Sequence, residues 1–364
     1  PRFVRVLRSG RMYPYALLVS IILVLQVRIR RKGRRELALL LSFLVLFLFA
    51  AMRGNGRGDY FNYLKFASYV TTPEVLWNPS FPTELGFRII AYIVNQAGLH
   101  LQAVIAAMNL ISLSCTYRFV REYSPDGLLS TILFLPFFFQ FDMHAARTAV
   151  AIGISTLGYK HVLERSYGKY ALVILCASLF HRSALVLLPI VFFLNVKHRS
   201  LPGLMSIGVA LALSMAVSFS ALVFRMVRAV GLVSLANKFY AYTQSDLYGY
   251  PFRLYDPRLL LTLGIYLMCL AFLDQDDAED RVLTNYMWLS VVLMIALREH
   301  TLFVTRLTAF LSFYSIIAVP RILLRLGMKG QISTKRIMKL GFVYTYLVYV
   351  TDLLAGAVEY RLFL

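Results

Sequence analysis

The chain has 364 residues, of which 59% are hydrophobic and only 15% are charged. With a mean hydropathy of +0.67, it has too little polar surface to cover a soluble globule of this length. The net charge of +20 does not indicate nucleic-acid binding, because the Lys and Arg residues are scattered between apolar runs. The sequence therefore predicts an all-α, polytopic integral membrane helix bundle, with residues 1–364 as one membrane domain.

The first third of the chain alternates between the two sides of the membrane. A span is expected at Tyr13–Val27, and the basic loop at 28–35 that follows it should be cytoplasmic by the positive-inside rule. Glu36–Met52 then crosses outward, so that residues 53–100 form an external loop. Within that loop, Glu84–Leu99 contains charged and polar residues, which favours a re-entrant or interfacial helix over a full span.

The middle of the chain continues with three apolar segments, at Leu101–Tyr117, Leu128–Phe141 and Ala145–Tyr159. The next run, Tyr170–Leu194, is interrupted by the tripeptide that begins at His181. It is either one span with a polar centre or two short helices that meet there, and the basic residues after it favour a hairpin.

The second half adds a second external loop, rich in tyrosine, at 225–257, and an acidic loop at Asp274–Asp280 that we interpret as a solvated connector. In total, about eleven or twelve membrane segments are expected. Further apolar segments lie at Gly203–Phe224, Arg258–Leu273, Val282–Leu297, Leu302–Val319 and Gly341–Ala357.

The three cysteines indicate neither a disulfide framework nor a metal site. Cys115, Cys176 and Cys269 each lie in an apolar stretch and have no paired spacing. We therefore expect small packing residues at these positions, and neither a metal nor a cofactor in the protein.

Arg147 is the most informative single residue, because its guanidinium stands in an apolar neighbourhood and cannot lose its charge. It must meet an anion or water, unless it lies at the end of a span and reaches the interface. The topology above groups it on the external face with other ionisable side chains. These are Asp59, His181, Arg298, Glu299, His300 and Arg306.

Two external features have the composition of ligand sites. The turn around Arg57 and Asp59 combines three glycines with the aromatic rings of Tyr60 and Tyr63, which suits a phosphate or a sugar as well as a flexible surface turn. Tyrosines such as Tyr240 and Tyr242 in the second loop offer a flat apolar face and a hydroxyl. That combination suits oligosaccharides, but tyrosines also populate membrane interfaces.

Several short motifs, taken in their order along the chain, resemble the EpsG and Wzy-type polysaccharide polymerases. The resemblance covers residues 50–200 well, and the second half more loosely through Lys238–Tyr242 and Arg306. The family commonly has Gly-Thr-Asp where this chain has Arg57-Gly58-Asp59. The motifs are Gly58-Asp59-Tyr60-x-x-Tyr63, Glu84-x-Gly86-Phe87, Arg147-x-x-x-Ala151-Ile152 and Phe180-His181-x-Ser183-Ala184-Leu185.

This resemblance implies a glycosyltransferase of the bacterial inner membrane that joins repeat units carried on undecaprenyl diphosphate at the periplasmic face. Its partners would be the lipid-linked glycan donor and acceptor, membrane lipid, and a chain-length regulator protein as a further candidate. Arginines suit the diphosphate, because its negative charge grows as the glycosidic bond breaks. The candidates for this role are Arg147 and Arg306, followed by Arg57 and Arg298.

The acceptor hydroxyl also needs a general base, for which the carboxylate or imidazole candidates are Asp59, Glu84, His181 and Glu299. The sugars would contact the four tyrosines named above. Two other functions remain open. An O-antigen ligase uses similar donors but is expected to have a longer external loop, and a lipid-oligosaccharide flippase predicts internal repeats and ionisable residues along a pore.

Overall fold

The computed structural model describes residues 13–28, 32–54, 59–197, 199–229, 240, 250–355 and 359–363. Within these residues the chain is helical, and its extended backbone pairing is a single bridge between Arg53 and Leu362. The chain divides into two compact units, and the expectation of a single membrane domain stays a prediction. Unit 1 contains residues 1–188 and 323–364, and unit 2 contains residues 189–322.

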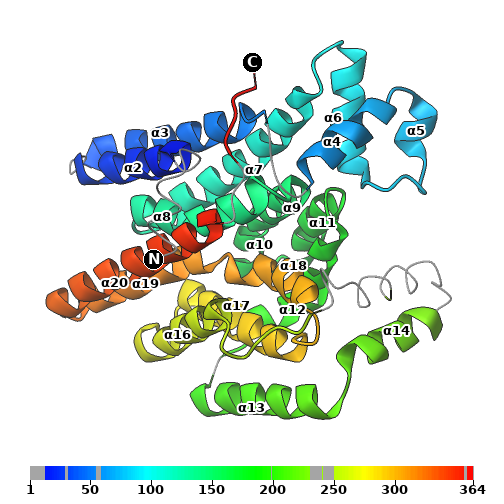
Figure 1. Cartoon of the computed structure of the whole chain (residues 1–364). Coiled ribbons are helices and arrows are strands. Elements are labelled where there is room, and N and C mark those ends of the chain that lie inside the picture. Colours follow the sequence, from blue (N-terminus) through cyan, green and yellow to red (C-terminus); the bar gives the residue numbers. More distant parts are fainter. Residues whose placement is uncertain are drawn as a thin grey trace. The chain divides into compact units, whose positions relative to one another are not determined.

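Unit 1 is built from the helices in the first half of the chain together with the last helix (Figure 1). They are α2 (Tyr13–Arg28), α3 (Lys32–Ala51), α4 (Tyr60–Tyr69), α5 (Pro73–Trp77), α6 (Leu85–Gln96), α7 (Gln102–Tyr123), α8 (Gly127–Phe137), the π-helix η2 (Phe138–Asp142), α9 (Ala146–Thr156), α10 (Tyr159–Leu163), α11 (Tyr167–Ser178), the 3₁₀-helix η3 (Arg182–Val186) and α20 (Ile332–Ala355).

Helix α7 is the centre of unit 1, because it packs against α3 on one side and α9 on the other. The backbones of α7 and α9 approach closely at Gly153, where a Cβ atom would lie 2.9 Å from the carbonyl oxygen of Ser112. Small residues permit such close helix contact, so Gly153 sets the spacing that places the start of α9.

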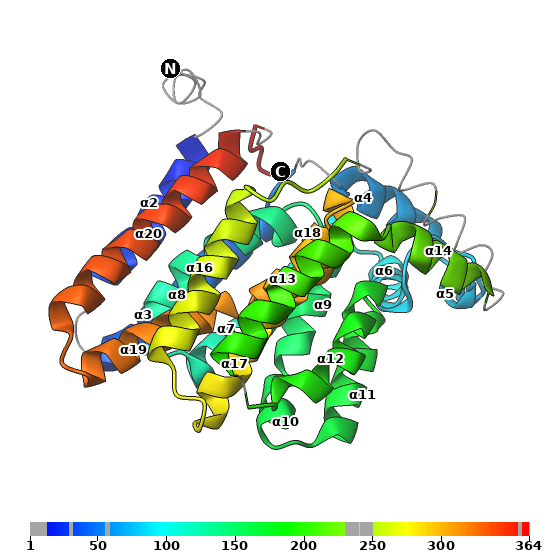
Figure 2. The same ribbon diagram turned by 90° about the horizontal axis from the view of Figure 1, so that it is seen from below.

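Helices α4, α5 and α6 form a group at one end of unit 1 (Figures 1 and 2). The sequence suggested loop structure for most of this region, but Tyr60, Tyr63 and Ala67 recur at helical spacing and pack with Phe87 of α6 in one buried cluster. Asn95 of α6 donates hydrogen bonds to the last carbonyls of α4, at 2.8 and 2.9 Å. The polar side chains of α6 that suggested contact with water therefore contact protein instead, as Arg88 and Asn95 do.

The length of α6 agrees with a helix that does not cross the membrane. Its 12 residues rise about 18 Å, whereas a hydrocarbon core is about 30 Å thick. The helix ends before Gly98, which adopts a left-handed φ of 63°.

The segment Tyr170–Leu194 consists of short helices, as the hairpin alternative predicted. Helix α11 ends at Ser178, η3 follows His181, and α12 (Leu187–Leu194) begins directly afterwards. The hydroxyl of Tyr170, near the start of α11, lies 3.5 Å from the carbonyl of Leu187, so the chain has turned back on itself. His181 therefore stands at a turn.

Two of the spans expected in unit 2 are not single continuous helices. The segment Gly203–Phe224 is broken between Ala216 and Phe219, and Leu302–Val319 is broken by a bend of 44° between two helices. Its helices are α13 (Ser200–Ala216), α14 (Phe219–Ala229), α16 (Pro257–Phe272), α17 (Ala278–Ala296) and α18 (Thr301–Ser312), followed by α19 (Ser315–Met328), which continues into unit 1.

The acidic loop before α17 is an ion-paired helix start and not merely a solvated connector. Asp277 caps the helix by accepting a hydrogen bond from the backbone N–H of Asp280. Arg321 lies within 3.1 Å of Asp277, 2.8 Å of Glu279 and 2.6 Å of Asp280. Such a network accounts for these acidic residues without a metal ion.

The described helices confirm an all-α membrane bundle. Two of them, Gln102–Tyr123 and Ile332–Leu354, are long and apolar enough to cross a membrane alone, and the bent pair α18 and α19 can serve as a third span. Other apolar helices have 10–17 residues. The expected count of eleven or twelve segments therefore stays a prediction.

Candidate functional site

Three helices of unit 1 begin next to one another and bring together three of the predicted site residues. Asp59 stands at the N-cap of α4, Glu84 at the N-cap of α6, and Arg147 is the second residue of α9. Helix N-termini carry partial positive charge, which favours the carboxylates of Asp59 and Glu84 at the N-caps of α4 and α6. Neither carboxylate caps its own helix through a side-chain hydrogen bond, so both remain free to face Arg147.

Arg147 binds the two carboxylates unequally. Its Nη1 lies 2.5 Å from Oε2 of Glu84, a charge-assisted hydrogen bond, while its Nη2 lies 3.9 Å from Oδ2 of Asp59. The side chains of Arg147 and Glu84 are 17% and 16% exposed, whereas Asp59 is 31% exposed. Glu84 is therefore the fixed counter-ion of Arg147, and Asp59 is the more accessible carboxylate.

Tyr63 forms hydrogen bonds with both Asp59 and Arg147. Its hydroxyl donates to Oδ2 of Asp59 at 3.3 Å and accepts the backbone N–H of Arg147 at 3.4 Å, and its ring lies 5.5 Å from the guanidinium carbon. Burial raises the pKa of Tyr63 to about 12, so the hydroxyl keeps its proton and remains a donor to the carboxylate.

Tyr60 and Tyr63 were expected to bind sugar, but both are buried, at 2% and 1% exposure. The hydroxyl of Tyr60 donates to Oε1 of Gln102 at 2.9 Å. Both rings pack inside unit 1, and sugar binding by these two tyrosines stays a prediction. They position the charged residues.

The turn that carries His181 is attached to the start of α6. The backbone N–H of Gly86 donates to the carbonyl of Leu179 at 2.7 Å, and a Cβ atom on Gly86 would lie 2.9 Å from that oxygen. Only glycine permits this approach without a shift of the backbone. The glycine in the Glu84-x-Gly86 motif therefore places the His181 turn beside Glu84.

The hydrogen bonding of His181 limits the chemistry it can perform. Its Nδ1 accepts the backbone N–H of Ser183 at 3.2 Å, so the neutral imidazole carries its proton on Nε2. A histidine in that tautomer offers a donor at Nε2, not a lone pair. The catalytic role expected of His181 stays a prediction.

Two further arginines belong to the surroundings of the cluster, because Arg88 lies near both Glu84 and Arg182. Arg88 is buried, and its Nη1 donates to the carbonyls of Val75, at 3.5 Å, and Asn78, so that it holds the loop after α5. Arg182 is exposed, and its charge lies close enough to Arg88 to repel it. We did not select Arg182 from the sequence, although it directly follows His181 in a recognised motif.

Arg53 is a second residue that sequence reasoning missed. It was treated as the start of an external loop, yet it is fully buried, with its Nη1 donating to the carbonyl of Met143. Burial lowers the pKa of Arg53 to about 10, so it is still charged at neutral pH, and Asp142 favours that charge. Arg53 fixes the turn before α9 to the end of α3.

The remaining predicted site residues are in unit 2 or lie outside the described residues. Arg57 and Tyr242 are outside them. Arg298 donates to the hydroxyl of Ser214 at 2.9 Å and so holds the end of α13. Glu299, just before α18, and Arg306, in the middle of α18, are half-buried, and Tyr240 is 54% exposed. Their expected grouping with Arg147 stays a prediction.

The cluster in unit 1 can bind an anion and accept a proton. It contains a partly accessible carboxylate at Asp59, a guanidinium oriented by Glu84, and an exposed cation at Arg182 close by. Among the described residues, no three His, Cys, Asp or Glu side chains are grouped as a metal site.

Among the comparisons with known proteins, one family model matches nearly the whole chain. The model of the EpsG family matches residues 36–363, which include all the cluster residues and the helices that position them. Comparisons with curated proteins and with solved structures find no match. Since the family match covers far more than half of the 364 residues, this membrane protein belongs to the EpsG family.

Proposed function

We propose that the protein is a membrane glycosyltransferase that polymerises oligosaccharide repeat units carried on undecaprenyl diphosphate into O-antigen or a related surface polysaccharide. Membership of the EpsG family supports polysaccharide synthesis by a membrane protein. The single observation that carries the proposal is the cluster of Asp59, Glu84 and Arg147 at three helix starts. It combines an accessible base with an oriented cation, which glycosyl transfer from a diphosphate requires.

In the proposed reaction, an acceptor sugar hydroxyl attacks the anomeric carbon of the donor glycan. The new glycosidic bond forms as the bond from that carbon to the diphosphate oxygen breaks, and the bonding electrons leave with the diphosphate. Asp59 takes the hydroxyl proton, because it is the more exposed carboxylate and its contact with Arg147 is long, at 3.9 Å.

The leaving diphosphate needs more positive charge than Arg147 alone supplies. Arg147 is balanced by Glu84 and Asp59, so these three residues together carry one net negative charge. Arg182 is exposed on the neighbouring turn, and the N-termini of α4, α6 and α9 add partial positive charge. We therefore assign Arg182 to the diphosphate with Arg147. Arg306, Arg57 and Arg298 remain further candidates.

The test of polymerisation uses a strain from which the gene for this protein has been deleted. We expect carrier-linked single repeat units to accumulate outside the cytoplasm, and long chains to return with the native protein, as read from the surface glycan on gels. Two other outcomes would contradict the proposal. Long carrier-linked chains that are never transferred would indicate a ligase, and repeat units confined to the cytoplasmic side would indicate a flippase.

The second test concerns the side of the membrane, which we propose to be the periplasmic side of the inner membrane in a multi-pass topology. In a background with Cys115, Cys176 and Cys269 replaced by alanine, a membrane-impermeant thiol reagent should label Glu74→Cys in intact cells. Glu164→Cys should react only after the cells are lysed. Both side chains are exposed, so access to each depends on its side of the membrane. The reverse labelling would refute this topology.

A further inference from the structure

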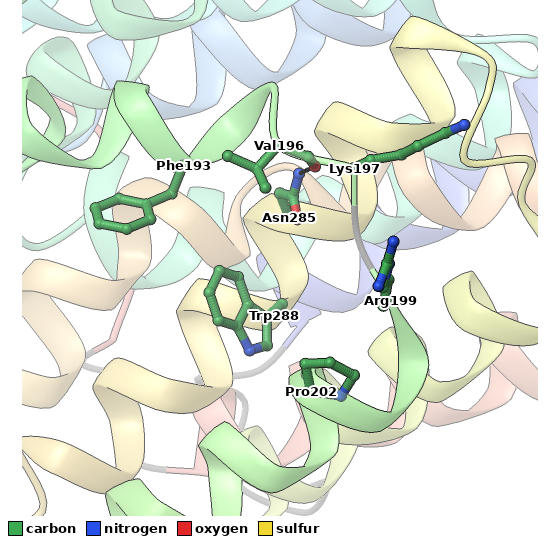
Figure 3. A pocket seen from close by; sticks show the side chains of 8 residues that line it. Phe193, Val196, Lys197, Arg199, Pro202, Asn285 and Trp288 are labelled. Carbon is green, nitrogen blue, oxygen red and sulfur yellow. Dashed lines mark hydrogen bonds between the residues drawn. The ribbon is translucent and has the colours of Figure 1, made fainter.

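Unit 2 contains a cavity of about 200 Å³ between the turn that joins α12 to α13 and one face of α17 (Figure 3). Its wall is largely apolar, with Phe193, Val196, Pro202 and Trp288. Lys197 and Arg199 lie at its edge, and the close-up shows them on the opposite side from the ring of Phe193. An apolar wall beside two cations suits a ligand with a hydrocarbon part and an anionic part.

The cavity is a built feature of unit 2. Asn285 of α17 is buried, and its amide donates to the carbonyls of Leu194, at 2.9 Å, and Val196, at 2.8 Å. Trp288, one turn further along α17, donates its indole N–H to the hydroxyl of Ser206 at 2.8 Å. These bonds fasten the end of α12 and the start of α13 to α17, and so hold the cavity open between them.

The two cations differ in how much charge they offer a ligand. Lys197 is paired with Asp276 at 2.5 Å. Arg199 is exposed and makes no ion pair among the described residues, and it occupies the N-cap of α13, where no side chain caps the helix. An arginine fork beside the positive end of a helix favours a phosphate group.

The surroundings indicate a membrane surface. Phe193, Leu201 and Met205 are 51%, 68% and 61% exposed next to the basic turn, which is the arrangement of an interface between hydrocarbon and lipid headgroups. The positive-inside rule puts this turn on the cytoplasmic side, where anionic lipids are attracted to basic residues. The volume of about 200 Å³ is below the roughly 300 Å³ of a drug-sized site, so it admits only part of a lipid.

We propose that this cavity binds an anionic phospholipid of the membrane. The lipid phosphate lies against Arg199 and the start of α13, and the glycerol with the first part of an acyl chain lies against Trp288 and Phe193. The site is separate from the glycosyl-transfer cluster of unit 1. The bound lipid stabilises the packing of α12 and α13 against α17, because a ligand that binds only the folded state raises the free energy of unfolding as its concentration increases.

The experiment measures thermal unfolding of the purified full-length protein in neutral detergent during titration with lipid. Phosphatidylglycerol should raise the midpoint, while phosphatidylcholine with the same acyl chains and inorganic phosphate should not. In Arg199→Gln, the phosphatidylglycerol concentration that gives the same rise of the midpoint should be about tenfold higher or more, which corresponds to about 1.4 kcal/mol of binding free energy. Arg199→Lys should need a smaller increase in phosphatidylglycerol than Arg199→Gln, because it retains the charge but loses the planar fork.

The matched control is Arg228→Gln, which removes an exposed arginine of α14 that does not line the cavity. It should titrate like the native protein, and because both arginines are exposed, neither glutamine variant should lower the midpoint without lipid. Equal effects of the two lipids, an equal effect of phosphate alone, equal responses of Arg199→Gln and Arg228→Gln, or no response to any lipid would each overturn the proposal.

Discussion

Asp59→Asn is expected to lower the rate of chain growth by about 10²–10⁴-fold, the usual contribution of a general base. Asparagine has the same shape and can still accept the hydrogen bond from Tyr63, which is 3.3 Å long in the native protein. The weak ion pair with Arg147, at 3.9 Å, is the main contact that is lost. The substitution should therefore remove proton acceptance with little effect on the fold.

The rate is measured with the purified protein in vesicles, using carrier-linked repeat units isolated from the deletion strain. The thermal unfolding midpoint of each variant shows whether the fold is kept. Glu74→Gln is the matched control, since Glu74 is an exposed carboxylate on the neighbouring helix α5 and lies outside the cluster. A rate for Asp59→Asn within about threefold of the native rate would exclude Asp59 as the base and leave Glu84, His181 and Glu299 as the candidates.

The sequence predicted the class of fold well but missed a helix that builds the site. Composition and apolar runs suffice for a membrane helix bundle. Helix α4 was not predicted, because the glycine-rich turn before it and its Tyr and Asn residues suggested a polar loop. The signal was nonetheless present, since Tyr60, Tyr63 and Ala67 follow the helical period and are all buried.

The sequence indicated which ionisable residues belong to the site, but not which of them contact one another. Asp59, Glu84 and Arg147 each attracted attention because an ionisable residue in an apolar chain needs a partner. Glu84 and Arg147 are 63 residues apart, so their 2.5 Å contact depends on how α6 and α9 pack, which local patterns do not encode. Arg53 was missed for the opposite reason, because its glycine-rich context resembles a surface turn while tertiary packing buries it completely.

Arg147→Ala is the second prediction with a large expected effect, because it removes the cation and also leaves Glu84 without its counter-ion. Glu84 is only 16% exposed, so the unpaired carboxylate should lower the free energy of unfolding by about 1.5–3 kcal/mol. Chain growth should be lost as well, since the diphosphate loses a bound guanidinium. Arg147→Lys keeps the charge but not the planar fork, so it cannot hold Glu84 and the diphosphate together, and growth should fall at least about tenfold.

The double variant Arg147→Ala with Glu84→Gln separates the structural role of Arg147 from its role in the reaction. Glutamine removes the unpaired charge, so most of the lost stability should return, while chain growth should stay absent because the cation is still missing. Denaturant unfolding in mixed micelles and the vesicle assay measure the two quantities on the same samples. If the double variant is no more stable than Arg147→Ala, the Glu84 contact is not what holds Arg147. If it regains chain growth, Arg147 does not bind the diphosphate, and that role passes to Arg182 and the further candidate arginines.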